Sequence, residues 1–139
     1  WIATIDEFQH WIYENPTHTK EERRIKWRSI LDDYSTHTTD WTGYEQVLDY
    51  SWHRQLHLFE VPFYYIEYGF AQLGAISVWM NSKINFQQAI TDYKAALKLG
   101  YTESIPKVYQ AANITFDFSK EHIQKLADFV KGELDELLK

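Results

Sequence analysis

The stretch from residue 57 to residue 75 concentrates side chains that could take part in chemistry. It begins with His57, continues through Pro62, and then places three tyrosines within five residues, Tyr64, Tyr65 and Tyr68. A helix that needed only an apolar face would use Leu, Ile and Phe, which have no polar atom to satisfy. Phenol and imidazole groups around one helix start therefore predict the polar wall of a cleft. Such a wall suits the binding of a peptide or the stabilisation of a developing oxyanion.

The spacing of the tyrosines favours a shared face but leaves its purpose open. Tyr65 and Tyr68 are three residues apart and Gln72 follows four residues later, so the three would share one face of a helix. Tyrosine is also a common core residue when its hydroxyl finds a partner. The residues alone therefore favour a place in the core and a place in a cleft wall equally for these tyrosines.

Two histidines and a glutamate in the same region have the spacing of a metal site. His53 and His57 are four residues apart, and Glu60 follows three residues later, so on one helix they could bind a metal. The peptidase version of this motif has Glu directly after the first His, and here that residue is Arg54. We therefore expect no metal ligands in this chain and interpret these histidines as loop residues, one of them structural.

The pair Glu7 and His10 matches half of a di-iron motif, Glu-x-x-His. Di-iron bundles need a second copy of that motif and two further glutamates. No second copy is present, so we interpret the two residues as structural. No Gly-rich phosphate loop, Gly-x-Ser-x-Gly or His-Glu-x-x-His occurs in the sequence either.

Composition narrows the class of protein. The chain has 139 residues, 45% of them hydrophobic and 17% aromatic, which fits one globular domain with large buried surfaces or a recognition cleft. The net charge is −6 without any block of Lys or Arg, so we expect neither nucleic acid nor membrane as a partner. The absence of cysteine excludes disulfides and thiolate chemistry and fits a cytoplasmic location. The first residue is Trp1, so we expect a piece of a longer protein.

Apolar residues recur at helical spacing along the whole chain, which predicts an all-α helical bundle forming a single segment, 1–139. The start and stop signals are those of helix caps. The expected helices are 2–15 before Pro16, about 20–35 after a Thr19–Glu22 capping box, 44–52, 62–83, 86–99 between Asn85 and Gly100, a short helix after Ser104 with Pro106 in its first turn, and 120–138 after Ser119, with a linker at 113–118.

The longest expected helix would begin at Pro62, whose missing N–H costs nothing in a first turn. One of its apolar stripes includes Phe63, Ile66 and Phe70, and a second includes Tyr64, Tyr68 and Trp79. A helix that is apolar on so many sides is expected in the middle of a protein.

Three segments of the sequence resemble the C-terminal part of oligoendopeptidase F. They are 5–13 (IDEFQHWIY), 54–68 (RQLHLFEVPFYYIEY) and 71–75 (AQLGA), and the resemblance extends over essentially the whole chain. That family comprises M3-type zinc endopeptidases of the thimet-oligopeptidase-like clan. The resemblance implies an all-α ellipsoid split by a deep channel that admits short peptides. It also implies peptide hydrolysis by a water that zinc activates, with His-Glu-x-x-His and a downstream Glu as ligands.

The zinc motif lies upstream in that family and is missing here, so the resemblance implies a C-terminal fragment that is inactive alone. Zinc is then a cofactor of the full-length enzyme only. His57 matches the family's substrate-binding histidine. Tyr68, and with it Tyr65, match the tyrosines that hydrogen-bond the scissile carbonyl and are the expected catalytic residues. Tyr64 lies on another face of the expected helix, which favours a structural role; it is retained with His57 as a candidate substrate-binding residue.

The expected partners are short oligopeptide substrates and the missing N-terminal part of the same chain, with self-association of the fragment in its absence. The alternative is a stand-alone helical protein-interaction module, loosely like a tetratricopeptide array. The run from Ala95 to Gly100 supports this alternative, but no period of roughly 34 residues follows it.

Overall fold

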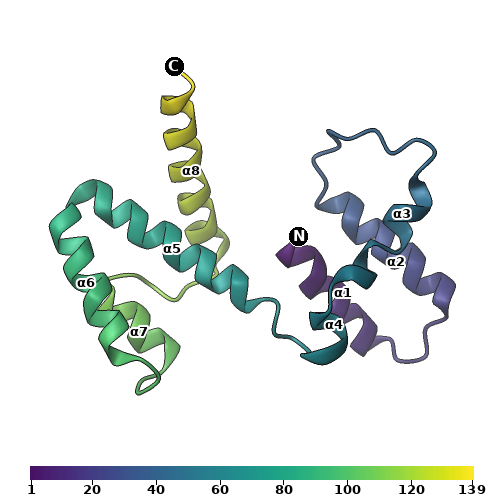
Figure 1. Ribbon diagram of the computed structural model, residues 1–139, viewed down its shortest axis with the longest axis horizontal. Helices are drawn as coiled ribbons and strands as arrows, with labels where there is room; N and C mark the ends of the chain where they lie inside the picture. Colours follow the sequence, from purple (N-terminus) through teal and green to yellow (C-terminus); the bar gives the residue numbers. More distant parts are fainter. The chain divides into compact units, whose positions relative to one another are not determined.

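The computed structural model describes residues 1–139, and every regular element in it is a helix (Figure 1). The expected all-α class is therefore confirmed. Contacts within the chain group into two compact units, residues 1–69 and residues 70–139. None of the helices combines the length and the apolar character that crossing a membrane requires.

The first unit is built on two long helices that lie side by side, α1 and α2 (Figure 1). Its elements are α1 (Ile2–Glu14), α2 (Lys20–Asp33), α3 (Glu45–Asp49), the 3₁₀ helix η1 (Ser51–Arg54) and α4 (His57–Glu60). The capping box predicted at the start of α2 is present. Thr19 Oγ1 accepts the Glu22 N–H at 3.2 Å, and the Glu22 carboxylate accepts the Thr19 N–H at 2.7 Å.

The core of this unit is made of large side chains from α1, α2 and η1. Its buried members are Ile5, Phe8, Trp27, Ile30 and Trp52. The ring of Phe8 contacts Trp27 at 4.9 Å and Trp52 at 5.4 Å between centroids, both at steep angles. Aromatic pairs prefer this edge-to-face geometry, so the core joins all three elements through specific contacts.

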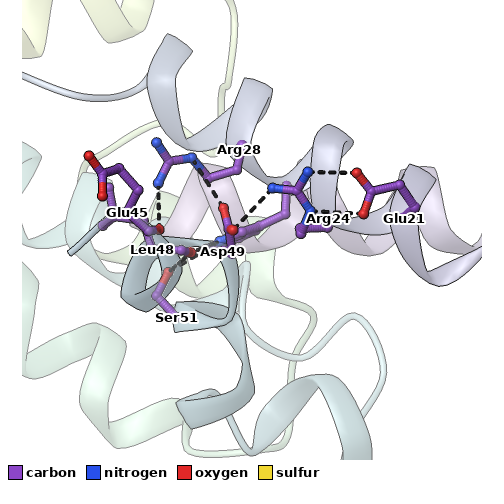
Figure 2. A network of polar contacts seen from close by, with 8 residues as sticks. Glu21, Arg24, Arg28, Glu45, Leu48, Asp49 and Ser51 are labelled. Atoms are coloured by element: carbon purple, nitrogen blue, oxygen red, sulfur yellow. Dashed lines mark hydrogen bonds and ion pairs between the residues drawn. The ribbon is translucent and has the colours of Figure 1, made fainter. Parts of the chain in front are cut away.

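A polar network ties α3 to the side of α2 (Figure 2). Arg24 and Arg28 both reach the Asp49 carboxylate, at 3.0 Å and 3.6 Å, and Arg24 also binds Glu21 at 2.6 Å. The hydrogen bond from Arg24 lowers the pKa of Glu21, and the same contacts raise the pKa of Arg24. The network fixes the segment from which η1 and α4 continue.

The indole of Trp27 also fixes the end of α3. Its Nε1–H donates to the Leu48 carbonyl at 2.8 Å and lies 3.2 Å from Ser51 Oγ. Ser51 Oγ in turn donates to the same carbonyl at 2.9 Å. A buried tryptophan therefore positions the start of η1 with its polar atom satisfied.

The helix expected from Pro62 begins later than the sequence predicted. α5 runs from Glu67 to Ile84, and residues 61–66 form turns. The reason is Phe63, whose backbone has φ of 58° and so lies in the left-handed region that helices avoid. A tertiary contact holds this conformation, because the Phe63 N–H donates to the side-chain oxygen of Gln9 on α1 at 2.9 Å.

The second unit comprises most of α5 and three further helices, α6 (Phe86–Leu99), α7 (Ile105–Ala111) and α8 (Lys120–Leu137), with α6 packed along α7 (Figure 1). Its predicted caps are largely confirmed. Asn85 accepts the Gln88 N–H at 3.1 Å, Ser119 accepts the His122 N–H at 3.2 Å, and α6 ends at Gly100 with φ of 53°. Ser104 precedes α7 but makes no side-chain cap.

A close approach between α5 and α7 organises this unit. A Cβ at Gly74 would lie 2.8 Å from the Tyr109 hydroxyl, which donates to the Phe70 carbonyl at 2.7 Å. Burial raises the pKa of Tyr109. Elsewhere α5 is less covered than its sequence predicted, since only Gly74 and Ser77 are buried and Trp79 is 39% exposed. A unit of this size has too little surface to cover every side of an apolar helix.

Candidate functional site

Four side chains singled out in the sequence meet in the first unit. The ring of His57 lies 5.8 Å from Tyr64, 5.0 Å from Tyr65 and 5.7 Å from Tyr68 between centroids. Tyr68 also contacts Tyr64 at 5.9 Å and Tyr65 at 5.2 Å. We call these four residues the aromatic cluster.

Three different pieces of chain supply the cluster. His57 opens α4, Tyr64 and Tyr65 come from the turns before α5, and Tyr68 lies in the first turn of α5. An uninterrupted helix from Pro62 would have pointed Tyr64 and Tyr65 about 100° apart around its axis. The turns gather them around one imidazole.

The turn at Phe63 is pinned to α1 by its backbone and by its ring. The ring packs against His10 at 4.9 Å and Tyr13 at 5.1 Å, while the N–H is held by Gln9. Gln9 is 2% exposed, and its Nε2 has no hydrogen-bond partner within the protein. The buried Gln9 amide thus makes its hydrogen bond to the turn through its oxygen alone.

The structure corrects the placement of Tyr64. The expected helix put it on a different face from Tyr65, which favoured a structural role. Because the residues before Glu67 are not helical, the Tyr64 ring instead stacks beside His57 with an interplanar angle of 22°. Tyr64 and Tyr68 are 43% and 45% exposed, whereas Tyr65 is half-buried against the core. The phenols of Tyr64 and Tyr68 are thus more accessible to a ligand than that of Tyr65.

A line of hydrogen bonds runs through the imidazole. His57 Nε2 lies 3.3 Å from the Tyr68 hydroxyl, and His57 Nδ1 lies 2.7 Å from Gln55 Nε2. The other end of that amide, Gln55 Oε1, accepts the indole N–H of Trp1 at 2.9 Å. Sequence reasoning missed both partners. Gln55 is two residues from His57 and matches no motif, while Trp1 is 54 residues from Gln55, a separation that no spacing rule covers.

The metal spacing of His53, His57 and Glu60 does not become a ligand set. His53 ends up in η1 against the rings of Trp52, at 4.1 Å, and Tyr50, at 5.4 Å, while His57 and Glu60 belong to α4. No group of three or more His, Asp or Glu side chains in the chain has the geometry to hold a metal ion. His53, His57 and Glu60 therefore form no metal site, and the zinc ion that the resemblance implies for the full-length enzyme finds no ligand set among the residues of this chain.

Glu7 and His10 do not pair with each other. Glu7 accepts the Tyr34 hydroxyl of α2 at 3.0 Å, and this hydrogen bond to a carboxylate raises the pKa of Tyr34. His10 Nδ1 instead lies 2.9 Å from the Asp6 carbonyl. Glu7 thus links α1 to α2, whereas the hydrogen bond of His10 stays within α1 and only its ring reaches another segment, at Phe63.

An open cavity of about 560 Å³ adjoins the start of the hydrogen-bond line. Its walls come from α2, the loop at 36–42 and the segment from α3 to η1, and they include Trp1, Arg28, Asp40, Trp41 and Arg54. Hydrogen bonds from the Thr42 side chain and backbone lower the pKa of Asp40, so this wall carries both a carboxylate and guanidinium groups. Trp1 contributes to the cavity and to the hydrogen-bond line at once.

Comparison with known proteins gives one line of evidence. No family model matches the sequence, and no curated protein matches it. A 3.1 Å crystal structure of a protein described as an oligoendopeptidase F does match, with a TM-score of 0.81 and 30% sequence identity. The match covers 96% of this chain and 24% of that chain.

The resemblance to oligoendopeptidase F is confirmed. It extends over nearly the whole of this chain, which spans about a quarter of the length of the matched oligoendopeptidase F. The all-helical architecture agrees with that match. The match thus supports a relation of this chain to a peptidase.

Proposed function

We propose that this chain is the C-terminal portion of a zinc-dependent oligoendopeptidase that hydrolyses short peptides, and that it supplies hydrogen-bonding side chains to the bound substrate. The observation that carries the proposal is the match to an oligoendopeptidase F over 96% of the chain at 30% identity. The aromatic cluster is additional support, because it gathers the residues that the resemblance selects at one exposed place.

The proposed chemistry of the cluster follows from what peptide hydrolysis requires. When water adds to the scissile carbonyl, the carbonyl carbon becomes tetrahedral and its oxygen acquires negative charge. A phenol O–H aimed at that oxygen binds it more strongly in the transition state than in the ground state, which is what accelerates the step. Tyr68 is the proposed donor, with Tyr65 beside it. His57 and Tyr64 are the proposed contacts to the rest of the peptide.

Zinc enters only as part of the larger protein. Because the residues of this chain form no ligand set, we propose that another part of the full-length enzyme binds the ion. That remaining part is then the main partner of this chain and forms the opposite wall of the peptide channel. On this view the chain alone does not hydrolyse peptides.

The decisive experiment compares tyrosine variants in the full-length enzyme. Tyr68→Phe keeps the ring and removes only the hydroxyl, so kcat should fall on the order of 10²–10³-fold while KM changes little. Tyr44→Phe is the matched control, since Tyr44 is 65% exposed and lies outside the cluster. Zinc content and melting temperature should be unchanged in both variants.

Other outcomes identify what is wrong. Wild-type kcat in Tyr68→Phe with a large loss in Tyr64→Phe would mean that Tyr64 is the carbonyl donor. Wild-type kcat in Tyr64→Phe, Tyr65→Phe and Tyr68→Phe would show that the tyrosine hydroxyls take no part in the reaction, which would overturn the proposal. Peptide hydrolysis by the isolated chain would also overturn it.

A further inference from the structure

The hydrogen bonds around His57 have only one consistent direction. An indole N–H is a donor and nothing else, so Trp1 can bind Gln55 only through the amide oxygen. That choice turns the amide NH₂ group toward His57, where it stands 2.7 Å from Nδ1. An NH₂ group is also only a donor, so Nδ1 must accept.

The direction then continues to the tyrosine. A neutral imidazole carries a single N–H, and with Nδ1 as acceptor this N–H is on Nε2. Nε2 faces the Tyr68 oxygen at 3.3 Å, so His57 donates and Tyr68 accepts. The proton of the Tyr68 hydroxyl is therefore not used by the imidazole and is free to be donated elsewhere.

The first donor in the line is itself held in place. The Trp1 ring stands edge-on to Trp27 at 5.7 Å, and Trp27 is fully buried. The Arg54 guanidinium lies over the Trp1 ring, 4.5 Å from its centroid, as a cation–π contact. The orientation of the line is thus anchored to the core rather than to a mobile side chain.

We propose that Trp1 and Gln55 are positioning residues that hold His57 as the Nε2–H tautomer, so that Tyr68 presents its hydroxyl proton to the substrate oxygen. This inference rests on the proposed function of Tyr68. It assigns a role to two residues that no motif selects. It also explains why a glutamine, with one acceptor and one donor end, stands between an indole and an imidazole.

A near-isosteric substitution reverses the direction. In Gln55→Glu, the carboxylate accepts from Trp1 and also from His57, so at a pH high enough to keep the imidazole neutral its single proton moves to Nδ1. Nε2 then becomes an acceptor, and the Tyr68 hydroxyl donates to it instead of to the substrate. In the full-length enzyme we expect kcat to fall on the order of 10²-fold with KM nearly unchanged, approaching the loss in Tyr68→Phe. Gln46→Glu, an exposed site in the same unit, is the charge-matched control.

The tautomer is read independently of activity by nitrogen NMR of the full-length enzyme with labelled histidine. The His57 signals are identified by their loss in His57→Ala. The expected spectra show a protonated Nε2 and an acceptor Nδ1 in the wild type, exchanged in Gln55→Glu. Trp1→Phe keeps an aromatic ring but removes the indole N–H, so it should give a mixture of the two tautomers and a few-fold lower kcat.

The outcomes separate the two proposals. If Tyr68→Phe lowers kcat but Gln55→Glu leaves the tautomer or kcat as in the wild type, the positioning role is wrong and the proposed function stands. If Gln55→Glu exchanges the tautomer while neither it nor Tyr68→Phe changes kcat, the hydrogen-bond line exists but the function proposed for Tyr68 is wrong. If Gln55→Glu fails to fold, Trp1→Phe decides, and a single Nε2–H tautomer in that variant overturns the role of Trp1.

Discussion

The two units of the chain are almost equal in length but bury very different side chains. The first, residues 1–69, has a core of two isoleucines and three large aromatic residues. The second, residues 70–139, fully buries only small residues and one leucine; these hydrophobic residues are Ala89, Ala96, Ala112 and Leu126. Large buried side chains contribute most of the hydrophobic free energy of a domain, so the first unit has much the stronger core.

The second unit also leaves many large apolar side chains exposed. Phe86, Ile90, Tyr93 and Leu97 recur at helical spacing along α6, and of these Phe86 and Leu97 are each 60% exposed. At the chain's end, Leu137 and Leu138 are more than 80% exposed. An apolar stripe of this kind on a helix is typical of a surface that another part of a protein covers. The unit that contains the candidate site therefore depends less than the other on being covered by a further part of a protein.

The largest effect that follows from this difference concerns the isolated chain in solution. We expect it to self-associate through the α6 stripe, and Leu97→Lys should shift it toward the monomer, because a lysine cannot be buried there without a partner. Light scattering over a range of concentrations measures this. Gln87→Lys, at another exposed position of α6, is the control. A monomer at high concentration that binds no dye for apolar surfaces would contradict the comparison.

Truncation of the buried aromatic core should cost more than truncation in the second unit. Trp27→Ala removes a fully buried side chain with its hydrogen bond to Leu48, and the free energy of unfolding should fall by about 3–5 kcal/mol. Leu126→Ala, a truncation at a buried leucine of α8, should cost about 2 kcal/mol, because a smaller side chain is removed and no hydrogen bond is lost with it. Urea unfolding followed by circular dichroism compares the two. Equal losses would show that the cores are equally strong.

Two glycines of the second unit test whether its helix contacts are specific. At Gly74 an added methyl group would displace Tyr109 and its hydrogen bond to Phe70, so Gly74→Ala should destabilise the unit by about 1–3 kcal/mol. At Gly132, in α8, nothing lies within 4 Å of the added atom. Gly132→Ala should therefore stabilise by about 0.5–1 kcal/mol, because alanine favours the helix. Thermal melts of both variants give the signs, and a stabilised Gly74→Ala variant would mean that the contact with Tyr109 is loose.

The smallest effect concerns the cap of α2. Backbone and side-chain hydrogen bonds from Thr19 lower the pKa of Glu22 from its ordinary 4.5. The carboxylate therefore stabilises the folded chain at any pH above about 4.5, and this contribution is lost as the pH falls through the lower folded-state pKa. Thr19→Ala should cost about 1 kcal/mol at neutral pH. Its unfolding free energy should also depend less on pH in that acidic range, which stability measurements at neutral and acidic pH would check.

The sequence predicted the helices well where the signals are local. Thr19 with Glu22, Asn85 and Ser119 all cap the helices that they were expected to cap, since a cap involves residues within one turn. Pro62 was a misleading signal. It is compatible with a first turn, but the conformation of the next residue is decided by Gln9, on a different helix. The start of α5 is therefore a tertiary property that no local pattern contains.

The same distinction applies to the candidate site. Composition and the resemblance selected His57, Tyr65 and Tyr68, and the structure brings them together, although their roles remain predictions. The face on which Tyr64 lies was wrong because it was calculated for a helix that is absent there. The link from Trp1 through Gln55 could not be predicted, since it depends on how α1 packs beside η1.

The turn at Phe63 is held to α1 by one amide oxygen, and this affects how often the turn is expected to open. The Gln9 side chain holds the turn through a single hydrogen bond from its oxygen. Its nitrogen has no hydrogen-bond partner in the protein while the turn is in place. Transient release of that bond would let the nitrogen reach water, so the cost of opening is partly offset. The turn that carries Tyr64 and Tyr65 is therefore expected to open more often than the helices beside it. Amide hydrogen exchange at Phe63 would then report how frequently the cluster loosens and re-forms.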